Sequence, residues 1–225
     1  MHRYSRSLTL IAIALAALAG FIDAVAFAST GFFASFMSGN STQLGVAIGS
    51  HVLDTARIAG GIVLAFVTGV MLAAIAARIW PQRRKAAVMT IATTGIALAA
   101  LLAGRIPDRL VLLLLAFAMG AENGVFSRDG EVSIGLTYMT GTLVRIGQKL
   151  AGAIVGDADP WGWLLYLLLW SGFLAGAIAG GYNYALHGFA SLWLALGAAV
   201  GLTVLLWLAA PTASGETLGT GSGAG

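Results

Sequence analysis

The sequence predicts an all-α polytopic membrane protein, and three observations lead to that fold class. The chain of 225 residues is 59% hydrophobic and only 9% charged, whereas a soluble domain carries roughly 25% charged residues. Its longest apolar stretches each approach the roughly 20 residues that a helix needs to cross a bilayer. The 31 glycines suit helix packing in lipid, where small residues let backbones approach closely.

The apolar pattern divides the chain into membrane segments. Eight are expected, at 7–28, 32–50, 57–80, 86–104, 108–127, 133–155, 160–184 and 188–209. The first apolar run is long and has no clear small-x-small cleavage site before Asp23, so it is interpreted as a retained helix rather than a signal peptide. Residues 1–210 are expected to form a single integral membrane domain. The Gly/Ser/Thr-rich residues 211–225 are expected to be a disordered tail.

Two polar, glycine-containing stretches lie inside segments 32–50 and 133–155, and they resemble each other. The aligned pairs are Met37 with Met139, Ser38 with Thr140, Gly39 with Gly141 and Gly45 with Gly147, all at a spacing of 102. Further matches join Gly20–Val25 to Gly120–Val125 at a spacing of 100, and Thr68-Gly69 to Ser171-Gly172 at 103. These matches predict two pseudo-symmetric halves, 7–105 and 106–210. Chance likeness between low-complexity helices is the alternative.

The number of crossings decides how the halves are related. If all eight segments span, the halves are parallel; if 32–50 and 133–155 dip in and return, six segments span and the halves are inverted. With the N-terminus in the cytoplasm, the basic loop from Arg78 to Lys85 also falls inside only when six segments span. We therefore favour an inverted repeat with two broken or re-entrant segments, with eight full spans as the alternative. Both arrangements place both termini in the cytoplasm.

An ionisable residue lies within the first segment. Asp23 is a functional-site hypothesis by default, because a carboxylate inside a membrane is costly unless it is paired or hydrated. Its repeat mate is Asn123, which follows Glu122. The three residues predict a proton- or cation-binding site or a polar wall of a substrate path. The alternative for Asp23 is that it caps its helix or reaches the interface.

The stretch from Ser38 to Gln43 places polar or glycine residues at every position. Irregular backbone at membrane depth persists only where it is buried in protein or lines a water-filled cavity, and transporters use such breaks to bind substrates or ions. The alternative is helix packing through small residues, with Asn and Gln bonding between helices. The predicted solute- or ion-binding residues of the two stretches are Ser38, Gly39, Asn40, Thr42 and Gln43, and Thr140, Gly141, Thr142 and Arg145.

Arg145 is the mate of Gln43, so the two halves differ in charge at this point. Arg145 could pair with Asp23 or hold an anionic group of a solute. Alternatively, it extends its guanidinium toward the cytoplasmic interface.

The sequence gives no sign of catalysis. Cysteine is absent and the three histidines are scattered, so neither thiol chemistry nor a metal site is expected. No phosphate-binding or dinucleotide fingerprint is present. We expect no cofactor and no nucleic-acid partner; membrane lipids and a small solute or ion are the expected partners, and a homodimer is plausible.

Residues Gly20–Phe27, Gly31–Phe33 and Phe36–Gly45 resemble the signature of the YoaK-like small bacterial membrane proteins, a domain of unknown function. The most specific part is Asp23 followed by Met37-Ser38-Gly39-Asn40, with Ser38 where Thr is commoner. The similarity covers residues 7–210. It implies a bacterial inner-membrane location and about six helices, but no substrate and no mechanism.

The duplicated polar stretches predict a small transporter or channel-like permease for an unidentified small solute or ion. A structural or regulatory membrane subunit is the first alternative. A lipid-handling membrane enzyme is the second, and it lacks an evident set of catalytic side chains.

Overall fold

The structure is a computed structural model that describes residues 6–128, 131–132, 138–156 and 160–209, and side chains over 8–126, 138–156 and 160–209. Nearly all of these residues are helical. The helices are α1 (Arg6–Thr30), α2 (Met37–Gly49), α3 (Leu53–Ile79), α4 (Arg84–Leu102), α5 (Asp108–Asn123), α6 (Met139–Val155), α7 (Leu164–His187) and α8 (Leu192–Leu208). Short 3-10 turns η1 (Pro81–Arg83) and η2 (Gly188–Ser191) precede α4 and α8. Strands β1 (Ser127–Arg128) and β2 (Glu131–Val132) pair antiparallel.

Each expected segment contains one of these helices, but the two polar segments begin later than predicted. The second was expected from residue 32, whereas α2 begins at Met37, and the sixth was expected from residue 133, whereas α6 begins at Met139. The residues between α1 and α2 are not helical. Residues 133–137 and the expected tail at 211–225 lie outside the described residues.

Four helical stretches in the described part of the chain are long and apolar enough to cross a membrane. They are Leu8–Thr30, Leu53–Ile79, Pro81–Leu102 and Leu164–Leu208. The last comprises α7 and α8, which turn at η2. Helices α2 with 13 residues, α5 with 16 and α6 with 17 lie outside these four stretches.

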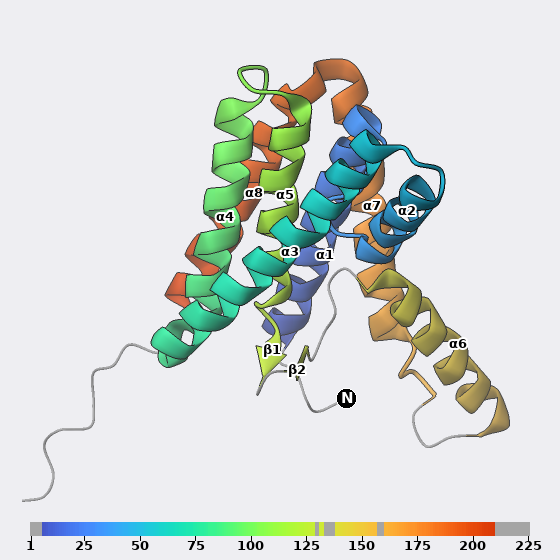
Figure 1. Cartoon of the computed structure of the whole chain (residues 1–225). Coiled ribbons are helices and arrows are strands. Elements are labelled where there is room, and N and C mark those ends of the chain that lie inside the picture. The colour runs from blue at the N-terminus through green and yellow to red at the C-terminus, as the bar shows by residue number, and fades with distance from the viewer. Residues whose placement is uncertain (1–5, 129–130, 133–137, 157–159, 210–225) are drawn as a thin grey trace, which may run out of the picture.

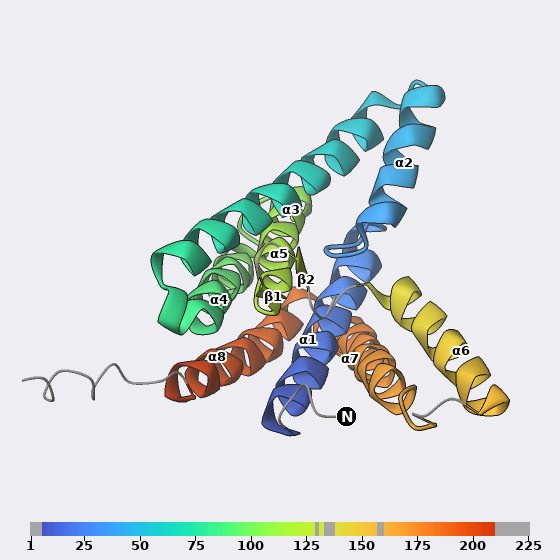
Figure 2. The same ribbon diagram turned by 90° about the horizontal axis from the view of Figure 1, so that it is seen from below.

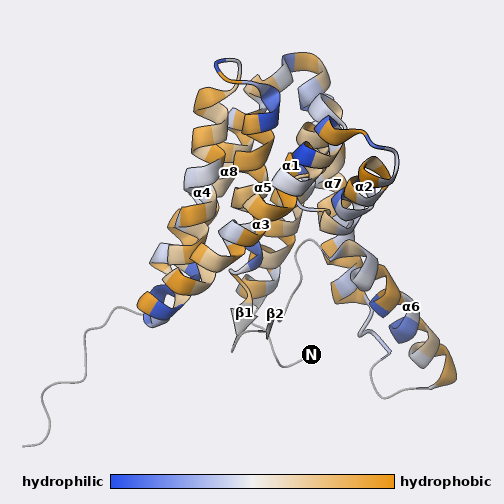
Figure 3. Ribbon diagram, in the orientation of Figure 1, coloured by the Kyte–Doolittle hydropathy of each residue, from blue (hydrophilic) through white to orange (hydrophobic). Residues whose placement is uncertain are grey.

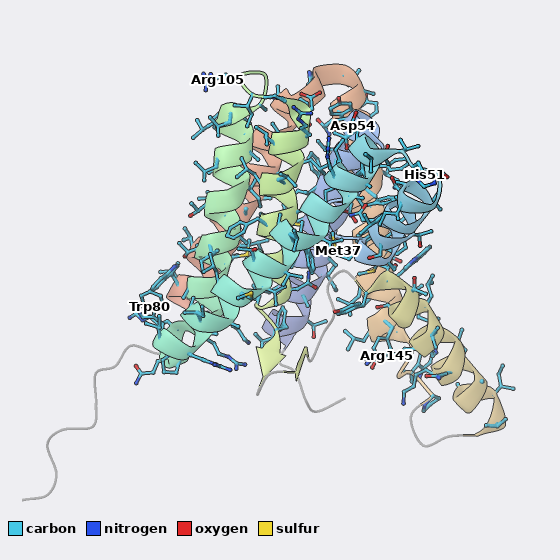
Figure 4. The ribbon with its side chains drawn as sticks, in the orientation of Figure 1. Met37, His51, Asp54, Trp80, Arg105 and Arg145 are labelled. Atoms are coloured by element: carbon cyan, nitrogen blue, oxygen red, sulfur yellow. The ribbon has the colours of Figure 1, made fainter. Side chains whose placement is uncertain are left out.

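The ends of the helices gather at two ends of the bundle (Figure 1). The α2–α3 turn, the α4–α5 turn and η2 lie at the upper end, where Figure 4 labels His51, Asp54 and Arg105. The start of α1, the α3–α4 turn near Trp80 and the strands lie at the lower end. Seen from below, α1 and α5 are central, and α2 and α6 lie at the periphery (Figure 2).

Two helix pairs cross with their backbones almost touching, and glycine makes this possible. At the α1–α7 crossing, a Cβ on Gly20 would overlap the carbonyl of Phe173, and one on Gly176 would overlap that of Ala17. Small residues allow this approach, which dispersion forces then stabilise in the absence of a hydrophobic driving force between helices in lipid.

The α3–α5 crossing has the same reciprocal arrangement. A Cβ on Gly120 would overlap the carbonyl of Phe66, and one on Gly69 would overlap that of Phe117. In both pairs each helix therefore supplies a glycine that receives the other's backbone, and on α7 Gly180 does the same for the carbonyl of Phe21.

The buried core and the outer surface are both apolar. The core is built mainly from α1, α4, α5 and α8, with large side chains such as Leu15, Met89 and Leu115 fully buried. Large apolar side chains such as Leu64 and Ile178 are exposed, and Figure 3 shows apolar residues along the outside of most helices. An apolar exterior of this kind suits contact with lipid rather than water.

Candidate functional site: the α1–α2 clasp and a buried carboxyl

The segment between α1 and α2 is held against the side of α1 by Asp23. Its carboxylate accepts hydrogen bonds from the backbone N–H of Ser35 and from the Ser35 hydroxyl, each at 2.7 Å. Asp23 lies seven residues before Thr30, the last residue of α1, which is about 10 Å along the axis at roughly 1.5 Å per residue. The chain therefore leaves α1, turns back along it as far as Asp23, and only then starts α2.

Asn40 fastens the same segment from the other side. Its side-chain oxygen accepts from the backbone N–H of Phe33 at 3.1 Å, and its amide nitrogen donates to the Phe33 carbonyl at 2.7 Å. Asn40 is fully buried, so the two bonds satisfy a backbone unit that has no helical partner. Gln43 adds a bond at 3.3 Å to the carbonyl of Gly31. We call Asp23, Ser35, Asn40 and Gln43, with the backbone they hold, the α1–α2 clasp.

The remaining residues of the first polar stretch do not face this clasp. Ser38 and Thr42 are exposed, and the Thr42 hydroxyl donates to the carbonyl of Ser38 one turn earlier. Gly39 leaves room for the Phe36 ring, whose atoms a Cβ would meet. The structure thus brings Asp23, Asn40 and Gln43 together and leaves Ser38 and Thr42 on the outer surface of α2.

The second polar stretch forms the start of α6. Thr142, the mate of Asn40 at a spacing of 102, is buried, and its hydroxyl donates to the Tyr138 carbonyl at 3.1 Å. Thr140 and Gly141 are exposed. The guanidinium of Arg145 lies 5.5 Å from the ring centre of Tyr166 on α7. The expected pairing of Arg145 with Asp23 is absent, because the one ion pair among the described side chains joins Arg57 to Asp54.

Glu122 differs from every other buried polar residue that the structure describes. It is fully buried on α5, and neither of its carboxyl oxygens has a hydrogen-bond partner. Asn123, the next residue, donates to the Met119 carbonyl at 2.8 Å. Asp23 on α1 is also buried, and helices α1 and α5 are in contact.

Two surface cavities lie away from these residues. One is at the lower end, beside Arg83, Lys85 and Leu206, and the other is at the upper end, beside Asp54, Arg57 and Arg109. No three His, Cys, Asp or Glu residues of the described chain lie together as a metal site would need.

Sequence reasoning missed Ser35 and the backbone of Phe33 as partners in the clasp. Ser35 is the hydroxyl residue that directly precedes Phe36 and Met37, yet no spacing rule joins it to Asp23. The pairing depends on the segment turning back along α1, which only the structure shows.

We expect Asp23→Asn to loosen the clasp. The charge is lost and one carboxylate oxygen becomes an NH₂ group, so the Ser35 hydroxyl must turn to accept from that group while the remaining oxygen accepts from the Ser35 N–H. Bonds to a charged group, which contribute about 1.5–3 kcal/mol each, then become neutral bonds of about 0.5–1.5 kcal/mol. Faster hydrogen–deuterium exchange across residues 31–36 would report the change. Ser35→Ala removes only the hydroxyl bond and should have the smaller effect; unchanged exchange in both variants would contradict the assignment.

Comparisons with known proteins agree with a membrane protein family. The sequence pattern of a family described as "Protein of unknown function (DUF1275)" matches residues 11–205. The UPF0700 transmembrane protein RA0705 of Rhizobium meliloti (strain 1021) is 37% identical over 206 residues, which cover 90% of this chain and 87% of that protein. The UPF0700 transmembrane protein YoaK of Bacillus subtilis (strain 168) is 27% identical over 144 residues, covering 60% and 64%. No solved structure matches the chain.

Proposed function

The chain belongs to the DUF1275 family, and we propose that it is an integral membrane protein that acts as a small transporter or channel-like permease in the bacterial inner membrane. The observation that carries this proposal is the clasp between α1 and α2. A non-helical segment that turns back along a membrane helix and then starts a short helix is the arrangement with which transporters form binding sites near the midplane. The resemblance to YoaK-like proteins is confirmed by the family match, but it names no solute.

The directions of the helices support an inverted repeat of residues 7–105 and 106–210. In Figure 1, α1 and α4 run from the lower to the upper end, and α3 runs down. Their counterparts run the opposite way: α5 and α8 run down, and α7 runs up. The short helices α2 and α6 follow α1 and α5 respectively. This pattern favours six spans with two re-entrant segments over eight full spans.

The glycine crossings support the same symmetry independently. Gly120 on α5 corresponds to Gly20 on α1 at a spacing of 100 residues. Phe66 on α3, which Gly120 meets, corresponds at a spacing of 107 to Phe173 on α7, which Gly20 meets. The reciprocal pair of Gly69 with Phe117 maps onto Gly176 with Ala17 under the same two shifts. The third helix of each half therefore aligns at a spacing of 107, one helical turn away from the 103 expected from the sequence.

The distribution of basic residues supports cytoplasmic termini. Arg78, Arg83, Arg84 and Lys85 lie at the α3–α4 turn, at the lower end where α1 begins (Figures 1 and 4). The upper end carries fewer basic residues, and acidic residues accompany them there. Since an excess of Lys and Arg marks cytoplasmic loops, we place the lower end in the cytoplasm.

In the proposed mechanism, the two halves rock about the α1–α5 contact. In the first half, the clasp keeps the solute path closed through Asp23 and Asn40. In the second half, the buried Thr142 and Asn123 line the corresponding part of the path. Release of residues 31–36 from Asp23 and Asn40 would free the Phe33 and Ser35 backbone groups to bind a solute. Ser38, Gly39, Thr42 and Gln43, with Thr140, Gly141 and Arg145, would then form the outer approaches to the path.

Single-cysteine labelling tests the topology directly, because the natural chain has no cysteine. We expect His51→Cys and His187→Cys to react with an impermeant maleimide from the same side, and Gln82→Cys from the opposite side. Eight full spans would instead put residues 51 and 187 on opposite sides. That outcome would exclude the re-entrant arrangement.

A flux screen tests transport itself. Purified protein in liposomes would be offered amino acids, sugars, monovalent cations and inorganic anions, with currents on a solid-supported membrane for charged solutes and isotope uptake for neutral ones. We expect at least one class to exceed the flux of protein-free liposomes. If no class does so in liposomes whose protein is verified as folded, the transport proposal fails.

A further inference from the structure

Glu122 is the feature of the molecule that packing alone does not explain. The other buried polar side chains of the described chain all make hydrogen bonds; they are Asp23, Ser35, Asn40, Asn123, Thr142 and Ser191. Glu122 makes none with either oxygen. An unpartnered buried polar group costs about 1–3 kcal/mol, and more when it is charged, so this position lowers stability and calls for another reason.

The surroundings of Glu122 supply no cation to balance a charge. Helix α5 packs against α1, α3 and α4. The titratable or charged residues described on these helices are Asp23 on α1, Asp54, Arg57 and Arg78 on α3, and Arg84 and Lys85 on α4, with Asp108 and Arg109 on α5 itself. Of these, Asp23 is the one that is buried, on a helix in contact with α5, and its charge has the same sign as that of an ionised Glu122.

Lys85 comes near this part of α5 but binds elsewhere. Its ammonium group lies 5.1 Å from the ring centre of Phe126, one helical turn beyond Glu122, and no ion pair joins it to Glu122 among the described side chains. A metal cation is also a poor fit, because hard cations need several oxygen ligands and no described polar atom bonds to Glu122. A proton requires no further ligand.

We propose that Glu122 carries an exchangeable proton, and that this proton is coupled to the opening of the α1–α2 clasp. The inference rests on the transport proposed above and identifies its coupling ion. In the closed state Glu122 on α5 is neutral, and the Asp23 carboxylate on the neighbouring helix α1 holds Ser35. When water reaches the site, Glu122 gives its proton to that water, leaving a carboxylate and a hydronium ion. Repulsion between two carboxylates then weakens the hold of Asp23 on Ser35.

The division of roles differs from the expectation that Asp23 is the coupling group. Asp23 accepts two short hydrogen bonds that stabilise its charged form, so it is suited to stay ionised and hold the segment. Glu122 has no bond that stabilises a charge and is suited to gain and lose the proton. Two neighbouring acids in unlike surroundings commonly divide the proton and the charge in this way.

Infrared difference spectroscopy between acidic and alkaline buffers tests the proton site without reference to transport. We expect a protonated-carboxyl carbonyl band that disappears at alkaline pH, is absent in Glu122→Gln, and persists in the control Asp54→Asn, whose side chain is exposed. A band that persists in Glu122→Gln, or the absence of any band in the wild type, would overturn the proposal. Loss of the band on adding sodium or potassium chloride at fixed pH would assign a metal cation instead and also overturn it.

Stability and coupling complete the experiment. Glu122→Met removes the unpartnered oxygens while keeping the volume, so it should melt at the same or a higher temperature; a large loss would indicate a structural role and contradict the proposal.

For a solute found in the flux screen, an inward proton gradient should raise wild-type uptake and leave Glu122→Gln uptake unchanged. An equal response in both would refute coupling. If the wild type moves no solute, the proposed transport fails, while the infrared band still decides the proton site.

Discussion

Gly120→Ala is expected to separate α3 from α5 and to lower the stability of the protein strongly. The new Cβ would overlap the backbone carbonyl of Phe66, which no rotamer change can move aside. Overpacking a core costs about 1–3 kcal/mol and sometimes more. We expect a cost near the top of that range, because whole helices must shift to relieve the clash. The melting temperature in detergent, followed by circular dichroism, measures the loss.

Gly45→Ala is the matched control. Gly45 lies inside α2, and a Cβ there would meet nothing within 4 Å. Alanine is the better helix former by up to about 1 kcal/mol, so this variant should melt at the same or a higher temperature than the wild type. If Gly120→Ala and Gly45→Ala behaved alike, the close crossing of α3 and α5 would be wrong.

The symmetry of the two crossings makes the prediction stricter. Gly20→Ala places a methyl group on the carbonyl of Phe173 in the α1–α7 pair, just as Gly120→Ala does on Phe66. The proposed repeat therefore predicts similar losses for the two variants. A large loss for one and none for the other would show that the halves do not share this packing.

The positions of the helices were more predictable from sequence than the register of the proposed repeat. Apolar runs of membrane length located the helices to within a few residues at most ends, because lipid selects strongly for such runs. For the third helix of each half, the match of Thr68-Gly69 with Ser171-Gly172 predicts a spacing of 103 residues. The contacts support 107, which places the same kinds of residue on the same helix face one turn away. Only knowledge of which glycine receives which carbonyl distinguishes the two.

The candidate site was predictable in part. Asp23 and Asn40 were identified because polar groups at membrane depth are costly, and both are buried. Their partners were not, because Ser35 and the Phe33 backbone reach them through a non-helical turn without a sequence signature. Ser38 and Thr42 looked equally promising in the sequence, yet α2 turns them outward. Glu122 was predicted together with Asp23, but its lack of hydrogen-bond partners could not be seen from sequence.

Asn40→Ala is expected to have the largest effect on the segment between α1 and α2. It removes both partners of the Phe33 backbone unit, an acceptor at 3.1 Å and a donor at 2.7 Å. Each buried backbone group left unsatisfied costs about 1–3 kcal/mol, unless the segment leaves the site and finds water. We therefore expect residues 31–36 to detach, with a lower melting temperature and faster amide exchange at Phe33.

Two further variants separate the clasp from a general effect of mutating α2. Thr42→Ala removes an exposed hydroxyl that bonds only to its own helix, and it should stay within about 0.5 kcal/mol of the wild type. Asn40→Asp keeps an acceptor for the Phe33 N–H but puts a carboxylate oxygen where the NH₂ group donated to the Phe33 carbonyl at 2.7 Å. Two acceptors then face each other, so exchange at Phe33 should be at least as fast as in Asn40→Ala. Unchanged exchange at Phe33 in Asn40→Ala would mean that Asp23 and Ser35 hold the segment alone.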